Sequence, residues 1–224
     1  KDIPMIRQLH LNPPLIFDPP MNIRTGKFQK VDTNPLEGWD SGRNKWLCYP
    51  AKVGPLLIHA YFHQKFMELG VSMANLFELA DDEDLIKKPD AVFAYGMPDG
   101  HMAKYGDLPT VFYDDKDNDI LVGAVPGDLK YGYFGYLKKM VLTLHNIVMM
   151  KRGMMPFHGA LVEILLRNNK KAAVLIIGDT ATGKSETIEA LRALGKNVIR
   201  NMIIIADDMG SLGLNAKGEI VGYG

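Results

Sequence analysis

Apolar residues recur with two different periods along the chain, and these periods predict several of its regular elements. Residues 91–95, 110–113 and 120–125 are short runs of β-branched and aromatic residues separated by Gly, Pro and Asp, which is typical of strands. Between residues 134 and 150, apolar side chains recur at intervals of three and four, which predicts a helix with one apolar face. We therefore expect a small mixed sheet followed by an amphipathic helix.

The N-terminal part of the chain gives weaker signals. Residues 11–52 are rich in Pro, Asn and Gly, which predicts irregular structure with short strands at most. Residues 56–69 carry apolar side chains in a mainly helical pattern, and residues 71–85 resemble a second, weaker helix. The acidic run 81–84 at its end is interpreted as a solvated face or a turn.

The C-terminal part alternates short apolar runs with turn residues. Residues 157–166 are predicted to form a strand, and residues 202–206 a buried strand that ends at Asp207 and Asp208. Residues 215–218 are typical of a hairpin turn. The sequence contains no internal repeats or low-complexity segments.

A glycine-rich segment between residues 178 and 185 follows the pattern G-x-x-x-x-G-K-[ST]. The apolar run 172–177 before it predicts a buried parallel strand, and residues 186–194 after it show helical spacing, with Gly195 as the stop signal. Strand, loop and helix in this order place backbone N–H groups and the positive end of a helix around a phosphate. We therefore expect a nucleoside triphosphate site, with ATP as the ligand.

The residues of this expected site are Gly178, Asp179, Thr180, Ala181, Thr182, Gly183, Lys184, Ser185 and Glu186. Lys184 is predicted to contact the β- and γ-phosphates, and the Ser185 hydroxyl to bind Mg²⁺. The alternative is a glycine turn between strand and helix, with Lys184 merely solvated.

Two neighbouring carboxylates, Asp207 and Asp208, follow the last apolar run. An acid at the end of a strand after a phosphate loop is suited to hold the cation that bridges the phosphates. Side chains of adjacent strand residues point to opposite faces, so one acid would bind metal and the other would act through water or as a base. The alternative is a turn in which Asp caps a helix or lies in the loop.

Three histidines are further candidates. His158 precedes a predicted strand and is interpreted either as a hydrogen-bonded core residue or as a ligand. His59 and His63 are spaced by one helical turn, but without a third ligand they are predicted to be ordinary helix residues. The 13 methionines are interpreted as flexible core residues.

Composition excludes several classes of protein. The 224 residues contain 26 basic and 26 acidic side chains, so no net charge attracts nucleic acid. No apolar stretch approaches the roughly 18 residues of a membrane span, so we expect no membrane partner. Cys48 is the single cysteine, which indicates a reducing compartment, and we expect a cytoplasmic location.

Two segments around the predicted helix carry a family resemblance. Tyr133, Gly135, Lys138 and Lys139, then Arg152, Gly153 and His158, resemble the Tyr-x-Gly-x-x-Lys-Lys and Arg-Gly-x-x-x-Met-His segments of the ATP-dependent phosphoenolpyruvate carboxykinases. The phosphate loop and the Asp pair follow in the same order as in that family. The resemblance covers about residues 128–224. It implies that oxaloacetate and ATP are converted to phosphoenolpyruvate, ADP and CO₂.

The resemblance also implies roles for individual residues. Lys139, His158 and Asp208 would coordinate Mn²⁺, and Tyr133 would line the site of a small carboxylate substrate. Lys184 and Ser185 would serve ATP and Mg²⁺. The catalytic candidates are thus Lys139, His158, Lys184, Asp207 and Asp208.

The loop and the acid pair differ from the usual carboxykinase motifs. The loop has Asp179, Ala181 and Ser185, and Asp208 is followed by Met-Gly-Ser. The loop with Glu186 and Thr187, and the residues before Asp208, are also similar to the HPr kinase/phosphorylases. There, an Asp of the pair acts as base toward a protein hydroxyl, so a protein substrate is the alternative partner, with Asp207 as base.

The expected fold is α/β with mixed sheets. A smaller N-terminal α/β region, residues 1–125, would precede a P-loop carboxykinase-like core, residues 126–224, that we expect to be truncated at its C-terminal end. A third hypothesis is a non-catalytic ATP-binding regulatory protein. In that hypothesis Trp39, Trp46 and Tyr49 would be exposed and would contact partners.

Overall fold

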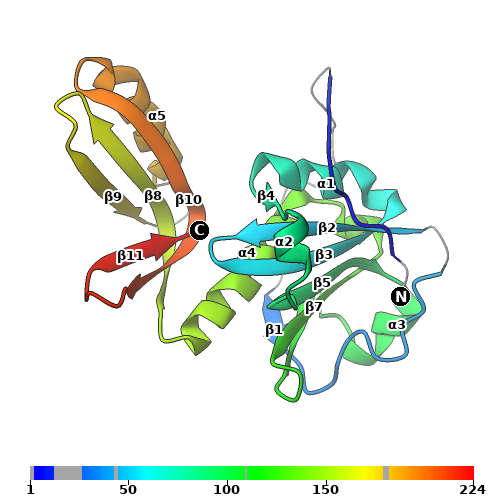
Figure 1. Ribbon diagram of the computed structural model, residues 1–224. Coiled ribbons are helices and arrows are strands. Elements are labelled where there is room, and N and C mark those ends of the chain that lie inside the picture. Colours follow the sequence, from blue (N-terminus) through cyan, green and yellow to red (C-terminus); the bar gives the residue numbers. More distant parts are fainter. Residues whose placement is uncertain (1–2, 13–26, 43–44, 109, 179–181) are drawn as a thin grey trace. The chain divides into compact units, whose positions relative to one another are not determined.

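Two mixed or antiparallel sheets organise the chain, which has a mixed α/β fold (Figure 1). The computed structural model describes residues 3–12, 27–42, 45–108, 110–178 and 182–224. Two compact units are present, Lys1–His145 and Asn146–Gly224, and each is described by itself. The division lies inside α4 (Phe134–Lys151), whereas the sequence-based division was placed after residue 125.

The first unit contains a seven-stranded sheet in the order β1-β6-β7-β5-β3-β2-β4. Strands β3, β5 and β7 at its centre are parallel, β1 is parallel to β6, and the other neighbours are antiparallel. The strands are β1 (Phe28–Lys30), β2 (Trp46–Val53), β3 (Leu56–His63), β4 (Glu78–Leu79), β5 (Ala91–Met97), β6 (Thr110–Asp115) and β7 (Ile120–Pro126).

Short helices connect these strands. They are η1 (Gln64–Phe66), α1 (Met67–Val71), η2 (Ser72–Asn75), α2 (Asp82–Leu85), α3 (Asp99–Met102), η3 (Ala103–Tyr105) and η4 (Leu129–Tyr131). The three predicted strands at residues 91–95, 110–113 and 120–125 are confirmed as β5, β6 and β7, and the predicted helix after them is confirmed as α4.

One face of this sheet packs against α1 and α4. A Cβ on Gly70 would lie 2.4 Å from the Phe62 ring, so α1 approaches β3 closely only because residue 70 has no side chain. A Cβ on Gly123 would lie 3.2 Å from Met140 Sδ, which shows that α4 covers β7. Phe62 and Met140 are completely buried here.

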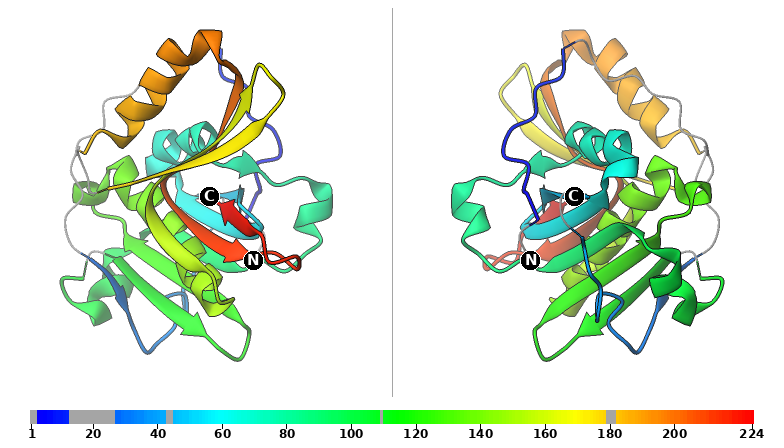
Figure 2. Two further views of the ribbon diagram at one scale, coloured as in Figure 1. Left: turned by 90° about the vertical axis from the view of Figure 1, so that its left-hand side faces the viewer. Right: turned by 90° about the vertical axis from the view of Figure 1, so that its right-hand side faces the viewer.

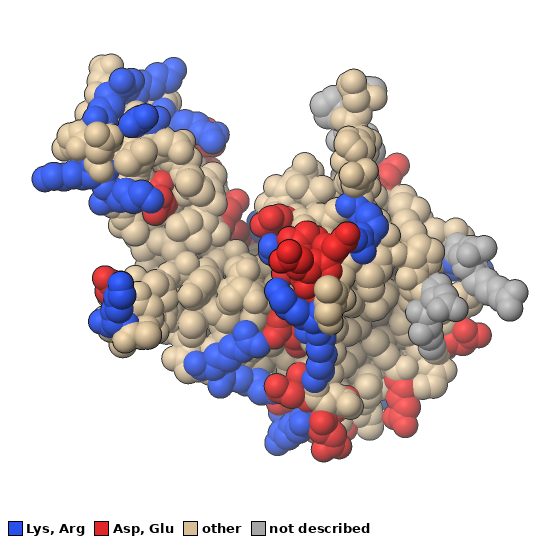
Figure 3. All heavy atoms as spheres, viewed as in Figure 1, with Lys and Arg blue, Asp and Glu red and all other residues tan. Residues whose placement is uncertain are grey.

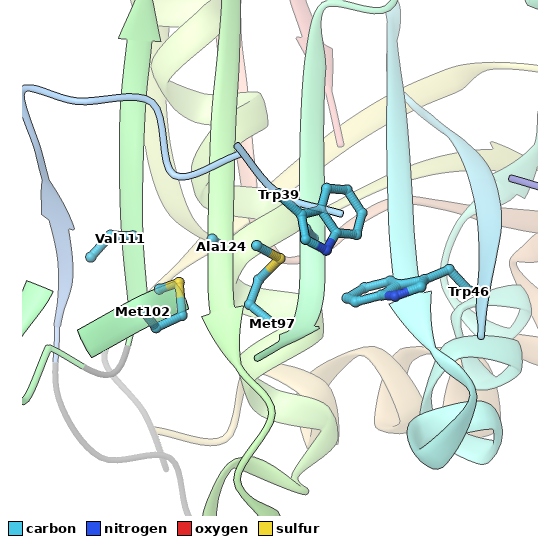
Figure 4. Close-up of a cluster of buried hydrophobic side chains, with 7 residues drawn as sticks. Trp39, Trp46, Met97, Met102, Val111 and Ala124 are labelled. Carbon is cyan, nitrogen blue, oxygen red and sulfur yellow. The ribbon is translucent and has the colours of Figure 1, made fainter. Parts of the chain in front are cut away.

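A tryptophan-containing cluster packs at another part of this sheet (Figure 4). The rings of Trp39 and Trp46 meet edge to face with their centroids 4.7 Å apart. Trp39 is 6% exposed, Trp46 5% and Tyr49 1%. The prediction that these aromatic residues are exposed was wrong, because they contribute apolar area to the core and leave none for a partner.

Two helix predictions in the first unit were also wrong. Residues 56–63 form β3, and of the predicted segment 56–69 only residues 67–69, the start of α1, are α-helical. Residues 71–85 contain η2, β4 and α2 instead of one helix. A strand buried on both faces has a nearly continuous apolar sequence, so the spacing of Leu57, Ala60 and Tyr61 also fits β3. The irregular structure predicted for residues 11–52 contains the eight-residue β2, while residues 13–26 and 43–44 lie outside the described residues.

The second unit has a curled antiparallel sheet in the order β11-β10-β8-β9. Its elements are β8 (Met155–Leu166), β9 (Lys171–Ile177), α5 (Lys184–Leu194), η5 (Gly195–Asn197), β10 (Ile199–Leu214) and β11 (Ile220–Tyr223). Figure 2 shows α5 lying along the sheet. Ile188 of α5 is buried with Ala160, Val162 and Ile164 of β8.

Predictions for the second unit were right in element type and partly wrong in environment. The strand at 157–166, the helix with its end at Gly195 and the hairpin turn after Leu214 are confirmed. However, β9 is antiparallel to β8 and much of it is exposed. β10 does not end at Asp207, and Ile203 and Ile204 within it are 52% and 43% exposed. The exposure of both strands follows from a sheet that has one helix instead of two covering layers. The connection from Leu166 to Lys171 is too short for a parallel crossover, so β9 is antiparallel to β8.

No helix in the described parts of the chain is long and apolar enough to cross a lipid bilayer.

Candidate functional site

The glycine-rich segment lies between β9 and α5, as the motif requires. Ile177 ends β9 and Lys184 begins α5, so the described residues show the order strand, loop, helix. Asp179, Thr180 and Ala181 lie outside the described residues. The first N–H groups of a helix have no acceptors within it, and with the helix dipole they favour an anion at this end.

The side chain of Lys184 connects the first residue of α5 to the first residue of the loop through a hydrogen bond. Its Nζ donates a hydrogen bond of 2.8 Å to the carbonyl oxygen of Gly178. Gly183, immediately before it, has φ +84°, a left-handed conformation that suits glycine. Thr187 secures the turn, because its hydroxyl donates to the Gly183 carbonyl at 2.7 Å. Ser185 and Glu186 lie exposed in the first helical turn, and Thr182 is also exposed.

His158 and Asp208 form a pair across strands β8 and β10. His158 Nε2 lies 3.2 Å from Asp208 Oδ1, and 50 residues separate the two in sequence. The strand register places Asp208 opposite Gly159, the residue after His158. The His158 side chain is 39% exposed and that of Asp208 19%, so solvent or a ligand reaches the pair.

The two neighbouring acids have different surroundings. Asp208 has φ +93°, an unusual conformation for a residue other than glycine, and strain of this kind costs about 1–3 kcal/mol. Asp207 lies opposite Ala160, is exposed, and forms no ion pair within the described residues. The strained backbone turns Asp208 toward His158 while Asp207 faces solvent.

A backbone contact joins this pair to the loop. The N–H of Gly178 donates to the carbonyl oxygen of His158 at 3.4 Å. A Cβ on Gly159 would lie 2.4 Å from the Ile176 carbonyl oxygen, so β8 and β9 approach closely at this point only with glycine. The contacts from Lys184 to Gly178, from Gly178 to His158 and from His158 to Asp208 therefore connect one site within the second unit.

The pair fits a divalent cation in its donor types and spacing. Cis ligands of an octahedral Mg²⁺ or Mn²⁺ lie about 3 Å apart, and the imidazole nitrogen and carboxylate oxygen are 3.2 Å apart. No cluster of three or more His, Cys, Asp or Glu residues suited to a metal is present among the described residues. The pair supplies two ligands, and further ligands would have to be water, substrate or a residue of another type.

Two other predicted site residues belong to the first unit. Tyr133 precedes α4 and is half-buried; its N–H donates to the Tyr131 carbonyl at 2.7 Å. Lys139 is a half-buried residue of α4. Their roles toward Mn²⁺ and substrate remain predictions.

The two histidines predicted to lie on a helix are both residues of β3. Burial lowers the pKa of His59, whose side chain contacts Tyr61 edge to face with ring centroids 6.2 Å apart. His63 ends the strand, and its Nδ1 accepts a hydrogen bond from the N–H of Lys65 at 3.2 Å. On a strand, residues four apart lie on the same face, so the helical interpretation of the spacing was wrong.

Acidic side chains gather over α2, as Figure 3 shows, beside a cavity of about 560 Å³ lined by Arg7, Gln8, Ala80, Asp81, Asp82 and Glu83. The acids are already engaged. Asp81 caps α2 by accepting from the N–H of Asp84, and Arg7 pairs with Asp82. Hydrogen bonds from Lys52 and Lys87 lower the pKa of Asp84 to about 2. The acidic run 81–84 forms the cap and the mostly exposed turn of α2, which agrees with the predicted solvated face.

Sequence reasoning missed the contribution of Gly159 and Thr187. Gly159 follows His158 directly, and a glycine next to a candidate ligand in a predicted strand signals close backbone approach. Thr187 lies three residues after Lys184, and only the first-turn geometry shows its bond to Gly183.

Compared with models of known protein families and with curated protein sequences, the chain gives no significant match.

Proposed function

We propose that this protein binds ATP at residues 178–186 and transfers its γ-phosphoryl group in a reaction of the phosphoenolpyruvate carboxykinase type. The observation that supports this most is the connected set of contacts from Lys184 through Gly178 to His158 and Asp208. These contacts connect Lys184, the first residue of α5, with a histidine–carboxylate pair on the adjacent strands β8 and β10. A simple glycine turn would need neither the pair nor the strained Asp208.

The proposed reaction proceeds in two steps. Oxaloacetate loses one carboxylate as CO₂, and the electron pair of that C–C bond forms an enolate. The enolate oxygen then attacks the γ-phosphorus, and the bond to the β-phosphate oxygen breaks to release ADP. A divalent cation, when bound, supplies positive charge next to the oxygen that becomes negative.

The residues of the chain have distinct tasks in this proposal. Lys184 exchanges the Gly178 carbonyl for phosphate oxygens, and the N-terminus of α5 orients the phosphates. The Ser185 hydroxyl would serve Mg²⁺, while His158 and Asp208 would hold Mn²⁺. The family resemblance assigns Lys139 to the metal and Tyr133 to the substrate, and these two roles stay predictions.

A second candidate is a kinase for a hydroxyl group of a protein or small molecule. Asp207 supports it, because this carboxylate is exposed and forms no ion pair within the described residues. A general base must be accessible to the proton that it removes. The regulatory alternative loses its support, since the aromatic residues proposed to contact partners are buried.

A coupled assay with ATP, Mg²⁺, Mn²⁺ and oxaloacetate tests the proposal through phosphoenolpyruvate formation. We expect Lys184→Ala to reduce the rate by roughly 10²–10³-fold, because it removes a charge that stabilises the transferring phosphoryl group. Lys196→Ala, an exposed lysine of the same unit, is the matched control and is expected to keep its activity. Bound ATP with no phosphoenolpyruvate, but with phosphorylation of a serine-containing protein or an alcohol, would favour the second candidate.

A Mn²⁺ titration followed by electron paramagnetic resonance tests the metal pair separately. His158→Ala and Asp208→Asn are each expected to weaken Mn²⁺ binding by about tenfold or more, since each removes one protein ligand. His10→Ala, an exposed histidine elsewhere in the chain, is the control. Equal Mn²⁺ affinity in all three variants would reject the assignment of the pair.

A further inference from the structure

The parallel strands of the first unit end at a second group of polar side chains. β3 ends at His63, β5 at Met97 and β7 at Pro126, and in parallel sheets ligands bind beyond these carboxyl ends. His63 and Lys65 lie at this edge, and neither takes part in the site proposed above.

The hydrogen bonding of His63 fixes what its ring can offer. Its Nδ1 accepts the Lys65 N–H, so in the neutral ring the hydrogen is on Nε2, which is a donor. The Trp46 ring packs edge to face against His63, with centroids 5.4 Å apart, and orients it. Burial lowers the pKa of His63, and the positive charges of Lys65 and Lys45 lower it further.

Lys65 presents a charge without a counter-ion. Its Nζ lies 5.3 Å from the centre of the Phe66 ring, and it forms no salt bridge in the part of the chain that the structure describes. Asp128, which follows β7 and caps η4, is engaged with Lys130: it accepts from the Lys130 N–H at 2.9 Å and lies 3.7 Å from its Nζ. Within the described residues, neither the Nε2 of His63 nor the Nζ of Lys65 has a hydrogen-bond acceptor.

Gly96 and Gly127 leave space for these side chains, because they have no side chains of their own. A Cβ on Gly127 would lie 3.0 Å from Lys65 Nζ and 2.9 Å from the Met97 carbonyl oxygen. Gly96 has φ +102°, and a Cβ there would lie 2.8 Å from the Cβ of His63. Side chains at either position would displace Lys65 or His63.

We propose that His63 and Lys65 form a binding site for a carboxylate group at the carboxyl edge of β3, β5 and β7. One ammonium charge and one neutral N–H donor match the single charge and two oxygens of a carboxylate. Phosphate carries more negative charge than the single positive charge of Lys65 can balance, because the His63 ring is neutral. The site goes beyond the proposed function, because it uses no residue of the phosphate loop or of the His158–Asp208 pair.

An NMR titration of the His63 ring in the intact chain tests this, with acetate as the probe. Acetate is expected to shift the His63 signal with saturation and to raise the pKa of His63, since a bound anion favours the charged ring. Lys65→Met keeps the packing over Phe66 and should weaken acetate binding about tenfold or more. Lys130→Met, a paired lysine at the same edge, should leave it unchanged.

Three results would overturn the inference. They are an unchanged His63 signal in acetate, an equal loss of binding in both lysine variants, and inorganic phosphate binding as tightly as acetate. Lys184→Ala serves as a further control, because it should strongly reduce the rate of the proposed ATP reaction but leave acetate binding intact. Failure of this site is thereby distinguished from failure of the proposed function.

Discussion

The two units differ in how completely they bury their sheets. The central strands of the first unit lie between two packed layers, and Phe62, Phe93 and Tyr95 in them are fully buried. The second unit has one α-helix against four strands, and Ile177, Ile203 and Ile220 are more than half exposed. The candidate nucleotide site lies in this less buried unit, where side chains remain accessible. We infer that most of the stabilisation from apolar burial comes from the first unit.

The strongest test of this comparison is a cavity in the first unit. Phe62→Ala is expected to lower the free energy of unfolding by about 3–5 kcal/mol, because Phe62 is fully buried against Gly70. Phe112→Ala, at a half-buried position on β6, should cost less. Denaturant unfolding measures both, and equal losses would contradict the assigned core.

Relief of strain in the second unit should have a smaller effect of opposite sign. Asp208→Gly is expected to raise the stability of this unit by about 1 kcal/mol, because glycine adopts φ +93° at little cost. In the proposed function, the same change should also weaken Mn²⁺ binding by about tenfold or more. Asp208→Ala removes the carboxylate and keeps the strain, so a stability gain of equal size in that variant would refute the explanation.

Lowering the pH should reduce the stability of the protein mainly through His59 in the first unit. His59 is 7% exposed and burial lowers its pKa, so the unfolded chain binds a proton at higher pH than the folded chain does. Stability is therefore retained above the ordinary histidine pKa of about 6.5 and falls below it, by at most about 1.4 kcal/mol per pH unit. Chemical denaturation at several pH values measures this slope. His59→Gln should reduce this slope. An unchanged slope in the variant would show that other groups cause the pH dependence of stability.

The smallest effect is expected on the exposed part of β10. Ile203→Thr should change stability by no more than about 0.5 kcal/mol, because the side chain is 52% exposed and Thr keeps the β-branch. Thermal unfolding checks this. A loss as large as that of Val162→Thr, at a buried site in β8, would show that the exposed face is covered in solution.

The sequence predicted elements well where one period dominated. α4 has a clear apolar face, and β5 to β7 are separated by Gly, Pro and Asp, so their types could be predicted. β3 could not be distinguished from a helix, because both of its faces are buried and its apolar run lacks alternation. The length of β10 was missed because its exposed isoleucines resemble those of a short buried strand.

The candidate site was predicted in part. The spacing of Gly178, Gly183 and Lys184 marks the loop locally, and the structure places them between β9 and α5. The closeness of His158 and Asp208 depends on strand register across 50 residues, which spacing alone does not give. Their pairing entered the prediction only through a family resemblance. The positive φ of Asp208 had no sequence signal, since its neighbours are typical of a regular strand.

The bond between the Gly178 N–H and the His158 carbonyl has a consequence for how this site can change in evolution. Main-chain atoms fix the spacing between the glycine-rich loop and the His158–Asp208 pair. Substitutions at positions 158, 207 and 208 can therefore alter the chemistry while the spacing persists. For the proposed phosphoryl transfer, this means that a few point mutations on an unchanged framework could give different acceptors.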